Sequence, residues 1–96
     1  MGKNPSVIFK QLYKQAKNKE ATLSKDGLTG LDLIIHQMNA KDECFYVPYT
    51  EVIREFLIEG YSEARAKKHI TQWINHDLLV TNTYGRYKLI GIYGVS

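Results

Sequence analysis

Cysteine, proline and long apolar runs are scarce in this chain, which has one cysteine and two prolines among its 96 residues. The single cysteine, Cys44, excludes an internal disulfide and any zinc site built from several cysteines. No stretch approaches the roughly 20 apolar residues of a membrane-spanning helix, and no apolar signal-peptide core follows the first residues. The sequence therefore predicts an intracellular, cytoplasmic protein with no membrane partner.

Patterns typical of catalysis and of cofactor binding are also missing. No glycine-rich segment has the spacing of a phosphate-binding loop. The three histidines, His36, His69 and His76, lack the close spacing of zinc ligands. Cys44, which precedes Phe45, is typical of a small buried apolar side chain rather than of a nucleophile. We therefore expect no enzymatic activity, no cofactor and no metal.

The chain does have enough apolar residues for one modest core, since 44% of them are hydrophobic. Its net charge of +3 is unevenly distributed. Residues 1–27 carry six lysines against two acids, residues 28–61 two basic residues against six acids, and residues 62–96 five basic residues against two acids. This segregation indicates an anionic partner that the two basic ends would meet, although an ordinary scatter of surface charge gives the same counts.

The N-terminal segment predicts a basic amphipathic helix and a connector. An Asn-Pro pair forms a typical helix start, and apolar residues then recur at four-residue spacing. The helix is expected over 5–18, and a polar connector over 18–27. The expected organisation is therefore an N-terminal basic helix with its connector, 1–27, followed by a domain, 28–96.

The remaining elements follow from capping residues, glycines and periodicity. They are a helix over 30–39, a short strand over 44–47, helices over 49–59 and 62–76, and a hairpin over 79–92. The turn of the hairpin is expected at Tyr84–Gly85. The inward stripe of helix 62–76 is formed by Ala66, Ile70, Trp73 and Ile74. Gly60 and Asp77 follow the last two helices, at positions that favour a left-handed backbone.

Four segments carry a resemblance to a known superfamily. They are residues 47–53 (Val-Pro-Tyr-Thr-Glu-Val-Ile), 59–62 (Glu-Gly-Tyr-Ser), 73–79 (Trp-Ile-Asn-His-Asp-Leu-Leu) and 85–89 (Gly-Arg-Tyr-Lys-Leu). With the order of the elements, they resemble the winged helix-turn-helix DNA-binding superfamily over residues 29–92. Asp77 departs from the pattern, since glycine is common at its position. The resemblance implies an α+β, mostly helical fold in the order helix–strand–helix–helix–hairpin, to which the chain adds an N-terminal amphipathic helix.

The same resemblance implies a function without catalysis. Helix 62–76 would enter the major groove of double-stranded DNA, and hairpin 79–92 would contact its backbone. The expected contact residues lie on the outward faces of these two elements: Arg65, Lys68, Thr71, Gln72, Asn75, Tyr84, Arg86 and Lys88. Arg65 would bind guanine, whereas Arg86 and Lys88, on one face of their strand, would bind phosphates. Such a protein would be a transcription regulator or a replication or partition accessory factor.

The sequence leaves two other functions open. The helix over 49–59 carries Glu51, Glu55 and Glu59 on one side and would bind another protein through them. The hairpin would alternatively bind single-stranded nucleic acid, with Tyr84 stacking on a base.

A homodimer is expected, because one small domain makes few DNA contacts and two half-sites multiply the affinity. The expected interface is the apolar side of helix 5–18, with Ile8, Phe9, Leu12 and Tyr13. The other side of that helix carries a lysine stripe: Lys10, Lys14 and Lys17. These lysines would pair with the glutamates of helix 49–59, within one chain or between two, or join the DNA surface.

Overall fold

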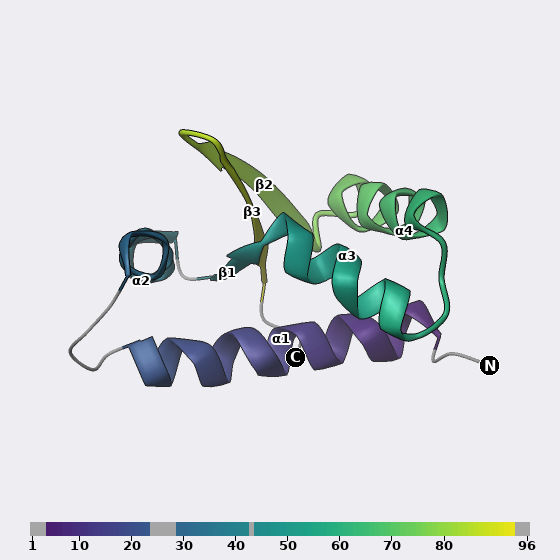
Figure 1. Ribbon diagram of the computed structural model, residues 1–96, viewed down its shortest axis with the longest axis horizontal. Coiled ribbons are helices and arrows are strands. Elements are labelled where there is room, and N and C mark those ends of the chain that lie inside the picture. The colour runs from purple at the N-terminus through teal and green to yellow at the C-terminus, as the bar shows by residue number, and fades with distance from the viewer. Residues whose placement is uncertain (1–3, 24–28, 43, 94–96) are drawn as a thin grey trace.

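The computed structural model describes residues 4–23, 29–42 and 44–93 (Figure 1). Within these ranges the chain forms four helices and three strands, an α+β fold that is mostly helical. They are α1 (Pro5–Leu23), α2 (Gly30–Asp42), β1 (Phe45–Pro48), α3 (Tyr49–Ile58), α4 (Glu63–Asn75), β2 (Leu79–Tyr84) and β3 (Tyr87–Ile92). No helix in the described part of the chain is long and apolar enough to cross a membrane.

The strands form an antiparallel sheet in the order β1–β3–β2, with β3 paired to both neighbours. In the hairpin, Tyr84 pairs with Tyr87, so the two-residue turn is Gly85–Arg86. This turn is one residue later than the expected Tyr84–Gly85. Gly85, with a φ of +60°, occupies the first turn position, where a left-handed backbone is required and glycine adopts it without strain.

Helices cover both faces of the sheet. Figure 1 shows α2 on one side of the sheet and α3 and α4 on the other. The main core joins α1, α3, α4 and one face of the sheet, and its buried residues are Ile8, Phe9, Leu12, Ala16, Val47, Val52, Ile53, Phe56, Ala66, Ile70, Trp73, Leu79, Ile90 and Ile92. A smaller cluster under α2, on the other face, contains Ile35, Cys44, Tyr46 and Leu89.

Helix α1 is longer than expected. It continues to Leu23 instead of ending at 18, because no glycine or proline interrupts residues 18–23. Helix α2 likewise continues to Asp42 instead of 39. The expected boundary near residue 27 falls outside the described residues.

The apolar side of α1 lies inside the protein. Ile8, Phe9 and Leu12 are only 1%, 5% and 3% exposed in the main core. Tyr13 packs edge-on against Phe45, with ring centroids 5.6 Å apart. The expectation that these four residues form a dimer interface is therefore wrong, because the core of the same chain buries Ile8, Phe9 and Leu12 and partly buries Tyr13.

Helices α3 and α4 end in the same way. Gly60 has a φ of +89°, and the following Tyr61 N–H donates to the Phe56 carbonyl at 3.0 Å. Asp77 has a φ of +62°, and the following Leu78 N–H donates to the Trp73 carbonyl at 2.9 Å. Both patterns belong to the Schellman motif, in which a left-handed residue ends the helix. The expected left-handed backbone at Gly60 and Asp77 is confirmed.

Gly91 of β3 marks the closest packing in the smaller cluster. A Cβ atom at this position would lie 2.8 Å from Tyr46 Cε1, 2.8 Å from Val80 Cγ1 and 3.0 Å from Cys44 Sγ. Tyr46 and Cys44 are both buried, with exposed fractions of 2% each. The close approach of these side chains to β3 therefore requires glycine at position 91.

A buried polar junction connects α1, α2 and β1. Asn39 of α2, which is 7% exposed, accepts a hydrogen bond from the Tyr46 backbone N–H and donates one to Glu20 Oε2 at 2.8 Å. His36 Nδ1 lies 3.6 Å from the other carboxylate oxygen of Glu20. Asn82 of β2 donates to the Tyr46 hydroxyl at 2.7 Å. The junction satisfies the Tyr46 N–H and the Asn39 amide, which would otherwise oppose the docking of α2, whereas His36 Nδ1 has no hydrogen-bond partner among the described residues.

Replacing Ile8 by alanine should strongly destabilise the protein, because this side chain is buried in the main core. The expected loss in the free energy of unfolding is about 2–5 kcal/mol. Ile58→Ala removes the same atoms from a helical site that is 63% exposed, and should change that free energy by less than about 0.5 kcal/mol. Denaturant titration of both variants measures the difference. Equal losses would contradict the placement of α1 in the core.

Asn39→Ala should cost about 1–3 kcal/mol of stability, because it leaves the buried Tyr46 N–H without an acceptor. Gln37→Ala, which removes an exposed amide from the same helix, is the matched control and should be close to neutral. Thermal unfolding followed by circular dichroism compares the two. A melting temperature unchanged in Asn39→Ala would mean that the junction does not hold α2.

Candidate nucleic-acid interface

Helix α4 presents a polar face to solvent because its opposite face is fixed in the core. Ala66, Ile70 and Trp73 are buried at helical spacing, as expected. The Trp73 ring lies between two other helices, with its centroid 5.2 Å from that of Phe9 and 5.3 Å from that of Phe56. This packing sets the rotation of α4 about its own axis. The outward residues of the helix are therefore defined by the core.

The outward face of α4 carries the five residues expected there. Arg65, Lys68, Thr71, Gln72 and Asn75 are all exposed. Thr71 is turned toward its own helix, since its hydroxyl donates to a backbone carbonyl one turn earlier at 2.9 Å. Glu63, the acid in the first turn of α4, forms an ion pair with Lys67, whose Nζ lies 3.8 Å from Glu63 Oε1. Lys67 is not among the site residues expected from the sequence. The outward face thus presents cationic and neutral polar groups.

Arg65 is held at the start of α4 by its neighbours. Ser62 caps the helix, and its hydroxyl oxygen accepts a hydrogen bond from the backbone N–H of Arg65 at 3.2 Å. The guanidinium carbon of Arg65 lies 4.8 Å from the centroid of the Tyr61 ring, a cation–π distance. Tyr61 in turn packs edge-on against the buried Phe56 at 5.2 Å. Arg65 therefore rests on a ring that is anchored in the core.

Tyr61 is a residue of this site that sequence reasoning missed. Its signal is positional: it follows Gly60, at the place in a Schellman motif where an apolar residue packs back on the helix. In the turn between the two helices, Gly60 ends α3 and Tyr61 supports Arg65 of α4.

The predicted hairpin residues point in different directions. Tyr84 is 53% exposed at the end of β2. The Arg86 guanidinium lies over the ring of Tyr87 at 5.6 Å, and Tyr87 packs against the smaller cluster under α2. The Lys88 ammonium lies 4.3 Å from the ring centroid of Tyr49, which packs against the main core on the other face of the sheet.

The expectation that Arg86 and Lys88 share one face of the strand is therefore wrong. Alternation of side chains holds only within a paired strand, and Arg86 lies in the turn. Lys88 alone faces the side on which α4 packs. Figure 1 shows α4 and the hairpin as two projections on the side of the molecule away from α1.

An ion pair joins the two helices that carry the lysine and glutamate stripes. Lys19 Nζ lies 3.4 Å from Glu51 Oε1, which joins α1 to α3. Lys19 lies outside the expected stripe, and reaches Glu51 because α1 continues beyond residue 18. The three stripe lysines, Lys10, Lys14 and Lys17, are exposed. An exposed ion pair of this kind contributes at most about 1 kcal/mol.

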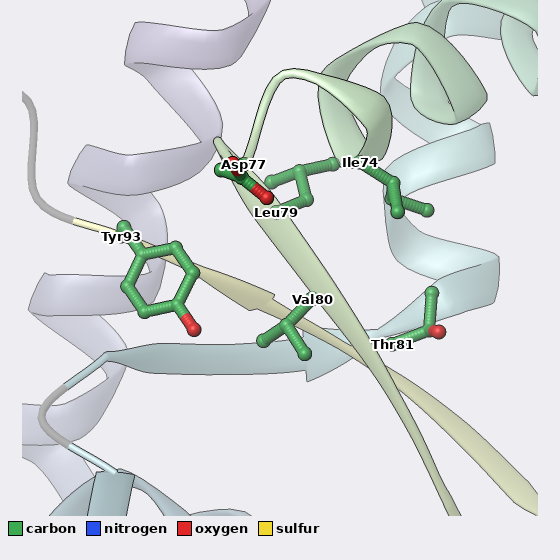
Figure 2. A pocket seen from close by; sticks show the side chains of 6 residues that line it. All are labelled: Ile74, Asp77, Leu79, Val80, Thr81 and Tyr93. Atoms are coloured by element: carbon green, nitrogen blue, oxygen red, sulfur yellow. The ribbon is translucent and has the colours of Figure 1, made fainter.

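An open hollow of about 540 Å³ lies where α4 meets β2. It is lined by Ile74, Asp77, Leu79, Val80, Thr81 and Tyr93 (Figure 2). Figure 2 shows Val80 and Tyr93 on one side of strand β2 and Ile74 and Thr81 on the other, so the hollow follows the outer edge of that strand. Asp77 is the charged member of the lining, which makes the hollow unsuited to an anion such as phosphate.

The described residues contain no group of three or more histidine, cysteine, aspartate or glutamate side chains placed to hold a metal ion. Cys44 is buried. No family model, curated protein or solved structure matches the chain. Its function is therefore inferred from its own surfaces.

Proposed function

We propose that the protein is a winged helix-turn-helix domain that binds double-stranded DNA. The order of the elements and the antiparallel sheet that ends in a hairpin support this fold. In this proposal α1, rather than α2, is the first helix of the motif, since α1 shares the main core with α3 and α4 whereas α2 packs on the other face of the sheet. Helix α2 is then an insertion between the first helix and β1.

The observation that carries the proposal is the outward face of α4. A helix about 10–12 Å across fits a major groove about 12 Å wide. Arg65 at its start offers a planar fork that matches the two acceptors of guanine, O6 and N7. The Gln72 and Asn75 amides each carry a donor and an acceptor, which match the N7 acceptor and the N6 donor of adenine. Because Arg65 rests on Tyr61, it loses little side-chain freedom on binding.

Contacts with the phosphates would come from Lys68 on α4, from Lys88 on the face of the hairpin toward α4, and from the exposed Arg86 in the turn at the tip of the hairpin. Such contacts position the protein on the duplex without reading its sequence. No step of this function needs a catalytic group or a cofactor. The role that fits is regulation of transcription, or an accessory role in replication or partition.

The contact residues should separate into two classes when they are replaced. Lys68→Ala, Arg86→Ala and Lys88→Ala should each weaken binding on all duplexes and lower the slope of log K against log salt by about one. Arg65→Ala should cost about 1–3 kcal/mol on a preferred site and less on random DNA. Fluorescence anisotropy with labelled duplexes at two salt concentrations measures both effects.

Two control variants sharpen this test. Lys41→Ala removes an exposed lysine from α2, on the other face of the sheet, and should leave binding unchanged. Arg65→Lys keeps the charge but not the fork, so the preference for the site should fall while the salt slope is retained. Unchanged binding in the Arg65→Ala, Lys68→Ala double variant would refute the assignment of α4. Tighter binding to single-stranded than to duplex DNA would favour the hairpin as a single-strand site.

A protein-binding role for α3 is the second candidate. Leu57 and Ile58 at the end of this helix are 48% and 63% exposed, and the exposed Glu51 lies on the same helix. An apolar patch beside acidic residues suits a basic amphipathic partner. Absence of duplex binding at low salt would favour this function over DNA binding.

A further inference from the structure

The two edges of the sheet differ in their protection. The outer edge of β1 is closed: this strand has four residues including Pro48, and the Tyr46 N–H donates to Asn39 instead of to another strand. The strand at the other edge, β2, has six residues without a proline or a charge. Soluble proteins commonly protect an exposed edge by short length, proline or lysine, because unpaired backbone groups recruit other strands. Strand β2 has none of these features.

The pairing pattern identifies the backbone groups of β2 that point outward. Tyr46 lies opposite Gly91 but donates its N–H to Asn39, away from β3. Tyr46 and Gly91 therefore form a non-hydrogen-bonded pair, in which the N–H and C=O of Gly91 point away from β1 and toward β2. Gly91 lies opposite Val80, and hydrogen-bonded pairs recur at every second residue of an antiparallel ladder. The N–H and C=O groups directed away from the sheet are therefore those of Leu79, Thr81 and Thr83.

The hollow at the end of α4 lies along this same edge. Its walls come from both faces of the sheet, with Val80 and Tyr93 on one and Ile74 and Thr81 on the other (Figure 2). An extended chain that continues a sheet needs space of this form, since its side chains alternate between the two faces.

We propose that this edge binds β2 of a second copy of the chain, as an antiparallel pair across a two-fold axis. The register that uses every outward residue places Thr81 opposite the second copy's Thr81, and Leu79 opposite the second copy's Thr83. It forms about six backbone hydrogen bonds and one continuous six-stranded sheet. An interface across a two-fold axis must be self-complementary. The outward residues Leu79, Thr81 and Thr83 are evenly spaced about Thr81, so each of them pairs with an outward residue of the second copy.

Charge at the two ends of β2 selects a second copy as the occupant. The exposed Asp77 precedes the strand and the exposed Arg86 follows it. In the register centred on Thr81, the Asp77 end of each β2 lies beside the Arg86 end of the other, so opposite charges meet at both ends of the pair. A parallel pair would instead bring like charges together, at both ends of the strand.

This dimer does not rest on the proposed DNA binding. If both hold, the two-fold axis perpendicular to the sheet keeps both α4 helices on the same face of the joined sheet, where one duplex can meet them. Dimer formation is measured without nucleic acid. A chain that does not dimerise is therefore distinguished from a chain that does not bind DNA.

The test is sedimentation velocity of the full chain between about 1 μM and about 1 mM. We expect a monomer–dimer equilibrium whose dissociation constant rises at least about tenfold in Thr81→Lys, because two like charges then face each other across the axis. Gln37→Lys adds the same charge to an exposed site on α2 and should leave the equilibrium unchanged. A full-length chain that stays monomeric, or a dimer unaffected by Thr81→Lys, would overturn the proposal.

Cross-linking tests the register and does not depend on the folding of the lysine variant. The Cα atoms of a hydrogen-bonded antiparallel pair lie about 5.5 Å apart, within the range of a disulfide. Thr81→Cys should therefore give a covalent dimer on mild oxidation, whereas Gln37→Cys should not. Equal cross-linking of the two variants, or none in Thr81→Cys, would contradict the pairing.

Discussion

The contact of Trp73 with Phe9 and Phe56 is the constraint on which the rest of the structure depends. These rings join α4 to the preceding helix α3 and to α1, which is distant in sequence, at one point of the main core. The burial of Trp73 determines which residues of α4 face outward. The polar face of this helix is thus a geometric consequence of the core, and the basic residues need only occupy the positions that the core leaves exposed.

The sequence predicts well those features that depend on local signals. The ends of α3 and α4 follow from Gly60 and Asp77, each of which has the left-handed backbone that its residue type favours. The phase of α4 follows from a strong apolar periodicity, and with it the exposure of Arg65 and Lys68. In these cases neighbours within one or two turns decide the conformation, so the information lies within a short window of sequence.

Features that depend on distant partners could not be predicted in the same way. The apolar stripe of α1 shows that one side of the helix is covered, but periodicity does not distinguish a second copy from α3 and the sheet. The placement of α2 depends on a cluster that includes Tyr46 and Leu89, two strands apart in the chain. The separation of Arg86 from Lys88 depends on a turn register that shifts by a single residue. Each of these outcomes is decided by tertiary packing.

The close packing around Gly91 has an evolutionary consequence. The Tyr46 ring, the Val80 methyl and the Cys44 sulfur all lie within 3.0 Å of the place that a Cβ at residue 91 would occupy. A change in any of these side chains therefore alters the space at position 91. A lineage can place a larger residue at position 91 only if the side chains at both positions 46 and 80 become smaller or move. These four positions should therefore covary among divergent relatives, and their joint pattern provides a signature for finding such relatives when the exposed residues have diverged.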